Sequence, residues 1–202
     1  MNAISRALAK QDRQRMEVRR EAGAESGTDW ATTLLFSCLH DKYGFGRNRF
    51  AAMNDMWEHL DEFQEGFIYD WRDELCEHGF DRFLNERIAE RMQKMITGRT
   101  RDLKLMAKTR DMIAGVAIVV FWTLYTKYRW RDKRLKDLQN YYKDKVYVLT
   151  HNEVPIWEFM KCLNVECNID YPALEAYEKQ NGPVDIYHGN RGEYQKKRSD
   201  RQ

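Results

Sequence analysis

Apolar side chains recur every three or four residues along most of this chain, which is the spacing of helices that bury one face. A clear set is Trp30, Leu34, Leu35, Cys38 and Leu39. Capping residues and glycines mark where such segments begin and end. The pattern predicts helices at about 5–21, 28–43, 47–65, 70–78, 82–97, 100–127, 131–145 and 171–180, with one more beginning near Pro155.

The predicted helix boundaries depend on glycines and on capping residues. Gly23 and Gly27 predict a break between the first two helices, because glycine is a poor helix former. Asp81 and Asn152 have side chains that can accept hydrogen bonds from the first turn of the helices after them. Residues 146–149 are predicted to be briefly extended.

The stretch from Met112 to Tyr125 contains no charged residue, a property that it shares with membrane-spanning helices. Its 14 residues are fewer than the roughly 20 that cross a bilayer core. We therefore predict a buried helix at the centre of the fold.

The chain also contains a weak internal repeat at a constant offset of 85 residues, which aligns 34–57 with 119–142. The aligned pairs are Phe36 and Phe121, Leu39 and Leu124, Lys42 and Lys127, Tyr43 and Tyr128, Phe45 and Trp130, Arg49 and Arg134, and Met53 and Leu138. Amphipathic helices can align by chance, but the shared Lys-Tyr-x-aromatic-x-x-x-Arg motif favours a duplication. Each copy is predicted to be a helix, a tight turn, a helix, a loop and a short helix.

The predicted fold is therefore all-α, with two diverged helix-turn-helix-loop-helix repeats packed about a central apolar helix. Residues 1–27 are expected to form a charged N-terminal helix, and residues 28–98 to hold the first repeat with the helix after it. Residues 99–182 hold the central helix and the second repeat. Residues 183–202 are a basic tail with too little apolar content to fold alone.

Composition favours a helical protein and shows that the charge is segregated. The 11 glycines, 3 prolines and 33% charged residues are unusual for a turn-rich β protein. The formal net charge is +2, but residues 55–81 hold ten acidic residues against one arginine. Residues 91–110 hold seven basic residues against one acidic residue, and residues 127–145 hold eight against three. The opening residues lack the apolar segment of a secretory signal, so we expect a cytoplasmic protein.

The second copy of the repeat mixes basic and aromatic residues. Cations neutralise phosphates and aromatic rings stack on bases, so this mixture suits nucleic acid. The predicted nucleic-acid-binding residues are Lys127, Arg129, Trp130, Arg131, Lys133 and Arg134. The alternative is a solvent-exposed helix whose aromatic side chains face the core.

The first copy has glycines at the same turn, Gly44 and Gly46, followed by Arg47 and Arg49. Free backbone amides beside arginines can hold a phosphate. We favour a tight turn with Phe45 in the core as the reason for the glycines.

The acidic stretch predicts a different kind of partner. Glu58, Glu62 and Glu65 follow one another at helical spacing and can present carboxylates like a row of phosphates. Such a row can occupy the nucleic-acid groove of another protein, so these three residues are the predicted partner-binding set. Simple solvation of an exposed helix face is the alternative.

Catalysis and metal binding have little support in the pattern. The five histidines occupy no recognisable ligand or triad spacing. The tripeptide Cys76-Glu77-His78 and the pair Cys162 and Cys167 come nearest to metal motifs, but each lacks the complementary pair of a zinc site. We therefore expect structural thiols, no metal, no cofactor and no enzymatic activity.

The sequence LHDKYGFGRNRF at 39–50, followed by an acidic segment and by Trp-Arg-Asp-Glu-Leu at 71–75, resembles small helical proteins of unassigned function encoded by phages and prophages of Gram-positive bacteria. The resemblance covers about residues 30–81. It implies a setting in which small helical proteins handle nucleic acid or block host defence proteins.

These observations together predict a non-enzymatic binding protein, encoded by a phage. It is expected to act on nucleic acid or on a nucleic-acid-handling host complex such as a defence nuclease. The alternative is a structural or assembly protein that works through helix packing, including as a homo-oligomer. No membrane partner is expected.

Overall fold

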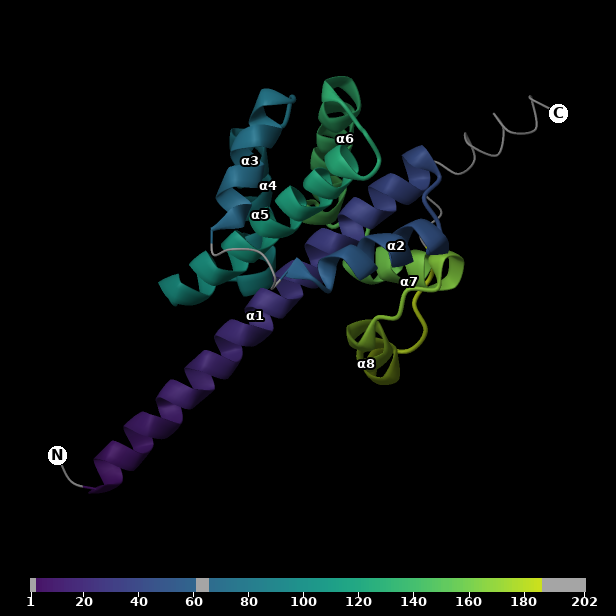
Figure 1. Cartoon of the computed structure of the whole chain (residues 1–202). Coiled ribbons are helices and arrows are strands. Elements are labelled where there is room, and N and C mark those ends of the chain that lie inside the picture. The colour runs from purple at the N-terminus through teal and green to yellow at the C-terminus, as the bar shows by residue number, and fades with distance from the viewer. Residues whose placement is uncertain (1–2, 61–65, 187–202) are drawn as a thin grey trace.

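Eight α-helices make up the described part of the chain (Figure 1). The computed structural model describes the backbone of residues 3–60 and 66–186, and the side chains within those ranges from residue 13 onward. The helices are α1 (Ala3–Tyr43), α2 (Arg47–Trp57), α3 (Phe67–Glu77), α4 (Arg82–Thr97), α5 (Leu103–Thr126), α6 (Asp132–Thr150), α7 (Ile156–Cys167) and α8 (Pro172–Asn181). No strand occurs within the described residues, which confirms the all-α prediction.

Helix α1 continues through the two glycines that predict a break, so that prediction is wrong. A Cβ atom on Gly23 would overlap Leu105 Cδ1 of α5, and one on Gly27 would lie 3.1 Å from the Thr109 carbonyl oxygen. The two glycines are four residues apart and therefore share one helix face. Because these two residues have no side chains, α5 can approach α1 closely. This packing keeps α1 helical at two positions where glycine disfavours a helix.

Helices α1 and α5 run parallel, in a register that brings their C-terminal ends together (Figure 1). Gly23 lies beside Leu105 near one end of the contact, and the ring of Phe45 lies 5.1 Å from that of Tyr128 beyond the other end. The two residues of each contact are separated by nearly the same number of positions in the sequence. The turns after the two helices therefore lie at the same height along the helix axes. On its N-terminal side α1 projects as a lone rod, and the side chains of residues 13–19 are exposed.

The apolar helix α5 has two different faces. One face is fully buried, and its central residues Ile113, Ala117, Phe121 and Leu124 are all 0% exposed. The other face is only half-buried and includes Val116. Within the described residues, none of the helices is both long enough and apolar enough to span a membrane.

Three other predicted boundaries differ from the structure. Residues 146–149 are helical rather than extended, because Val146 and Leu149 are buried and continue the inward face of α6. Asn152 does not cap α7, because it has a φ of 56° and the helix begins only after Pro155. Helix α2 ends at Trp57 instead of extending to residue 65, and residues 61–65 lie outside the described part.

The turns after α1 and after α5 share the same backbone hydrogen bonds. The Phe45 amide donates to the Leu39 carbonyl at 3.1 Å, and the Trp130 amide donates to the Leu124 carbonyl at 3.0 Å. Gly44 has a φ of 65° and Arg129 a φ of 56°, so the second turn adopts the left-handed region without glycine. These positions match at the offset of 85 that aligns the sequences.

A buried ion pair ties α6 to α1 close to the first turn. Lys145 Nζ contacts Asp41 Oδ2, and the two side chains are 4% and 8% exposed. The same ammonium donates to Ser37 Oγ at 3.1 Å. Because a buried charge is costly when it is unpaired, removal of either partner would be strongly destabilising.

Gly27→Leu is expected to lower the free energy of unfolding by about 1–3 kcal/mol, because the new side chain must displace the backbone of α5. Gly115→Ala is the matched control, since Gly115 is also helical but no described atom lies within 4 Å of its absent Cβ. That change is expected to raise the free energy of unfolding by about 0.5–1 kcal/mol through helix propensity. Urea unfolding followed by circular dichroism measures both, and equal effects would contradict the close contact.

Candidate nucleic-acid interface

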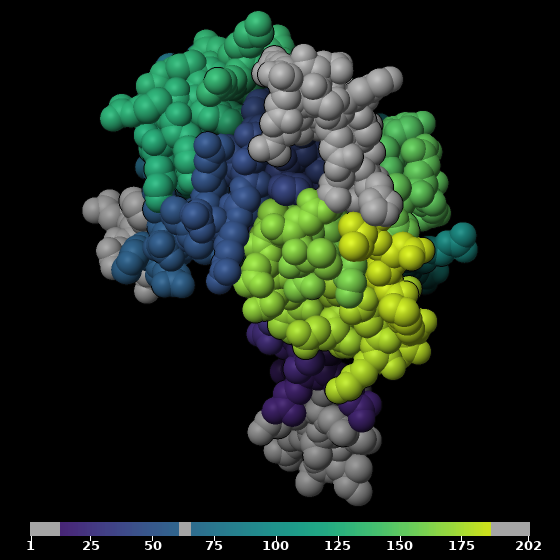
Figure 2. All heavy atoms as spheres, turned by 90° about the vertical axis from the view of Figure 1, so that its right-hand side faces the viewer, coloured from purple at the N-terminus to yellow at the C-terminus, as the bar shows by residue number. Residues whose placement is uncertain are grey.

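The turn after α5 contacts helix α2, which follows the turn after α1 directly. The Tyr128 hydroxyl donates to the Arg49 carbonyl at 3.2 Å, and Lys127 Nζ donates to the Ala52 carbonyl at 2.7 Å. Figure 2 shows this side of the molecule, with the blue atoms of α2 adjacent to the green atoms where α6 begins. Residues that are far apart in the sequence therefore share one surface.

Aromatic rings from both turns form the contact beneath this surface. The ring of Trp130 lies 4.6 Å from that of Tyr43 and 6.1 Å from that of Phe45. Trp130 is 4% exposed, so in this conformation it has no free face for a base to stack on. Burial raises the pKa of Tyr43 to about 12 and also raises the pKa of Tyr128, so both phenols stay neutral near pH 7.

The cations predicted from the second copy lie on the exposed side of the turn. Arg129 and Lys133 are exposed at its tip and at the start of α6. Arg131 is also exposed, and its guanidinium donates to the Tyr125 and Trp130 carbonyls at 3.2 and 2.9 Å. This pairing orients the side chain along the turn while it keeps its positive charge.

Two arginines from the first copy join these cations, and the sequence analysis did not include them in the site. Arg47 and Arg49 are exposed at the start of α2. The Arg49 guanidinium lies 4.9 Å from the Phe45 ring centroid, as that of Arg134 lies 5.7 Å from Trp130. The aligned pair Arg49 and Arg134 was a signal that could have indicated Arg49, whereas Arg47 aligns with Asp132.

We call the combined set the two-turn basic surface. Its members are Arg47, Arg49, Lys127, Arg129, Arg131, Lys133 and Arg134. Between residues 127 and 136 the chain contains one acidic residue, Asp132, whose carboxylate lies 3.4 Å from His78 Nδ1. The surface is therefore strongly positive, and it takes its charge from two separate segments.

The predicted acidic partner site is described only in part. Glu58 is exposed at the C-cap of α2. Glu62 and Glu65 lie outside the described residues. Helix α2 ends at Trp57, before the first of the three glutamates. The predicted row of carboxylates on one helix therefore has no helical support within the described residues.

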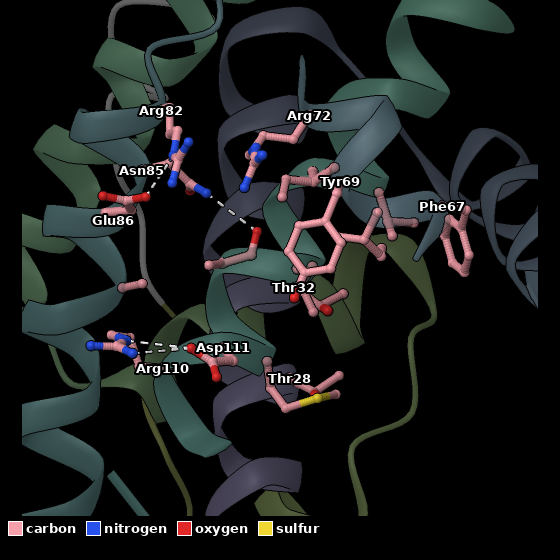
Figure 3. Close-up of a pocket in the computed structure, with 18 of the residues that line it drawn as sticks. Thr28, Thr32, Phe67, Tyr69, Arg72, Arg82, Asn85, Glu86, Arg110 and Asp111 are labelled. Atoms are coloured by element: carbon pink, nitrogen blue, oxygen red, sulfur yellow. Dashed lines mark hydrogen bonds and ion pairs between the residues drawn. The ribbon is translucent and has the colours of Figure 1, made fainter. Parts of the chain in front are cut away.

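A groove with a volume of about 1360 Å³ lies among α1, α3, α4 and α5, on the half-buried face of α5 (Figure 3). Its large exposed apolar side chains are Tyr69, Phe83 and Met112, which are 64%, 73% and 41% exposed. Figure 3 shows Tyr69 on one wall and the ion pair of Arg110 with Asp111 on another. The groove is a concave apolar surface of the kind that binds ligands or helices.

One group of possible metal ligands uses no residue of either surface. His40 of α1 meets Cys162 and Glu166 of α7, with one ligand atom of each within 4.8 Å of the others. The sequence pairs Cys162 with Cys167, because His40 is more than 100 residues away and only folding brings it to Cys162. The four-residue spacing of Cys162 and Glu166 on one helix was the available signal.

Comparison with known proteins adds no assignment to these sites. The chain matches no known protein family, no curated protein and no solved structure.

Trp130→Ala is expected to lower the free energy of unfolding by about 3–5 kcal/mol, because it removes a buried ring from the contact between the two turns. Lys133→Ala, at an exposed neighbour, is expected to change it by no more than about 0.5 kcal/mol. Chemical unfolding monitored by circular dichroism measures both. If Trp130→Ala left the stability unchanged, Trp130 would not be a structural core residue, and its ring would instead be available to contact a ligand.

Proposed function

We propose that this protein binds nucleic acid through the two-turn basic surface and is not an enzyme. The observation that carries the proposal is the contact of Lys127 with the Ala52 carbonyl and of Tyr128 with the Arg49 carbonyl. These contacts join two basic segments into one surface. A surface with seven cations suits the regularly spaced phosphates of a nucleic-acid strand.

Phosphate contacts, rather than base stacking, supply the affinity in this proposal. The aromatic rings of the two turns are occupied by one another, so the exposed chemistry is guanidinium and ammonium. Helices α2 and α6 both begin at this surface, and neither N-cap, Gly46 or Arg131, makes a side-chain capping bond. The positive ends of both helices therefore add to the attraction for phosphate. Binding of this kind depends weakly on base sequence.

We also propose that the two turns descend from one duplicated unit, as the alignment of 34–57 with 119–142 predicts. Support comes from their equal backbone hydrogen bonds and from the arginine that lies over an aromatic ring in each. On this proposal Arg49 and Arg134 have equivalent roles toward phosphate. We further propose that the protein is encoded by a phage and acts in the host cytoplasm.

Replacement of Arg47, Arg129 and Lys133 by glutamate is expected to weaken binding to a short oligonucleotide by more than about tenfold at low salt. These side chains are exposed, so helicity should not change. The slope of log affinity against log salt should fall by about 3, because each lost phosphate contact releases one counterion fewer. Replacement of Arg91, Arg99 and Lys104 by glutamate is the matched control, with the same charge change on other exposed positions.

If both triple variants lost the same affinity, the loss would follow from net charge alone, and the two-turn basic surface would not be the binding site. Glu58, Glu62 and Glu65 supply a further comparison. If their replacement by lysine releases a bound nucleic-acid-handling protein, and the basic replacements do not, direct contact with nucleic acid is excluded in favour of that protein partner.

The groove supports a second candidate, an assembly protein in which copies of this chain pack together. The N-terminal part of α1 projects from the core with exposed side chains at residues 13–19, and the groove is open to solvent. A groove that accepts the projecting α1 of another copy would make a head-to-tail contact. The exposed part of α1 carries many charged side chains, and charged surfaces favour weak, reversible contacts. Arg20 is already paired with Asp102 at 3.0 Å within the same chain.

Phe83→Glu together with Met112→Glu is expected to abolish self-association on this second candidate, because both side chains line the groove. Val165→Glu is the control, since Val165 is an exposed apolar residue on α7, away from the groove. Sedimentation velocity across a concentration series measures the outcome. A native protein that stays monomeric at every concentration would remove this candidate.

A further inference from the structure

A cluster of three metal-ligating side chains joins α1 to α7. His40 comes from α1, while Cys162 and Glu166 lie one turn apart on the same face of α7. His40 Nε2 lies 2.7 Å from Glu166 Oε2. The three ligand atoms all lie within 4.8 Å of one another.

The orientation of the His40 ring is fixed by a backbone contact. Its Nδ1 lies 2.7 Å from the Phe45 carbonyl oxygen. A carbonyl oxygen can only accept, so Nδ1 carries the proton and donates it. A proton lies between Nε2 and Glu166 Oε2, which are 2.7 Å apart, and loss of that proton leaves the lone pair on Nε2 facing Glu166. Histidines that bind metals are held in this way, with the second ring nitrogen bonded to a carbonyl or carboxylate.

Burial of the cluster is graded from a closed side to an open side. Cys162 is 1% exposed, whereas the side chains of His40 and Glu166 are 19% and 23% exposed. The thiol therefore lies at the bottom, and the imidazole and carboxylate form an edge that solvent reaches. An ion can enter from this edge and find a sulfur ligand within.

We propose that His40 Nε2, Cys162 Sγ and the Glu166 carboxylate bind a divalent transition metal ion of the zinc type. Imidazole, thiolate and carboxylate are the three protein ligands that zinc prefers. Tetrahedral zinc holds its ligand atoms about 3.3–3.8 Å apart, given bond lengths of about 2.0–2.3 Å. Small side-chain rotations would open the 2.7 Å between Nε2 and Oε2 and bring the thiol, which is within 4.8 Å of both ligands, to that separation.

Metal binding at this position would link α7 to the first turn. The ion takes the place of the thiol proton of Cys162 and of the proton shared between His40 and Glu166, so binding releases protons. Through Nδ1, His40 also holds the Phe45 carbonyl in the turn after α1. The ion would therefore stiffen the contact between α1 and α7.

Cys167 provides a matched control for the sulfur ligand. It is on the same helix and is also 1% exposed, but its Sγ lies 3.4 Å from Nδ1, the ring nitrogen that faces Phe45. Cys167 is therefore outside the ligand set. Cys162→Ser and Cys167→Ser remove equally buried thiols from the same helix.

The test is equilibrium dialysis of the full chain, freed of metal by a chelator, against Zn²⁺, with elemental analysis of the bound metal. The native protein and Cys167→Ser are expected to bind about one ion per chain. Cys162→Ser and Glu166→Gln are expected to bind at least about tenfold more weakly. With Co²⁺ in place of Zn²⁺, Cys167→Ser should keep the thiolate-to-metal absorption and Cys162→Ser should lose it.

Circular dichroism of the metal-free variants ensures that each one is folded, and Glu166→Gln tests the site without removing a buried side chain. No Zn²⁺ bound by the native protein above the level of a chelated sample would overturn the proposal. Equal binding by Cys162→Ser and the native protein would also overturn it, as would equal loss in the two serine variants.

Discussion

The close parallel packing of α1 against α5 is the constraint on which the remaining structure depends. Gly23 and Gly27 lie where side chains would meet Leu105 and Thr109, so the two helix backbones approach one another directly. Because the helices run in parallel and in register, their turns meet at one end. A side chain at Gly27 would press on the Thr109 carbonyl oxygen of α5, 3.1 Å from the added Cβ atom. This close packing holds the two turns at the same level, where their basic residues share one surface.

The helices themselves could largely be predicted from the sequence, since three- and four-residue spacing of apolar residues reports a buried helix face directly. Asp81 caps α4 as predicted, with its side chain accepting from the Leu84 amide at 2.9 Å. The breaks at Gly23 and Gly27 were wrong because glycine has two uses, in turns and in close helix packing, that look alike in one sequence. Only the tertiary contact with α5 distinguishes them.

The candidate sites were predicted less completely than the helices. The basic residues of the second turn could be identified because they are consecutive, but Arg47 and Arg49 join them only through packing of the two turns. An aromatic residue such as Trp130, between basic residues, can stack on a base or pack in the core. The sequence does not distinguish the two roles, whereas the packing of Trp130 against Tyr43 shows that it belongs to the core. Of the His40 cluster, only the four-residue spacing of Cys162 and Glu166 is visible in the sequence, since the packing of α1 against α7 brings His40 to them.

The central claim is that both turns together contact nucleic acid. Hydrogen–deuterium exchange of the native protein, with and without a short oligonucleotide at low salt, tests it most directly. The account predicts slower amide exchange on binding in both segments, 44–52 and 127–136, with the groove-lining part of α5 unchanged. Protection confined to one turn, or found only along the groove, would contradict it.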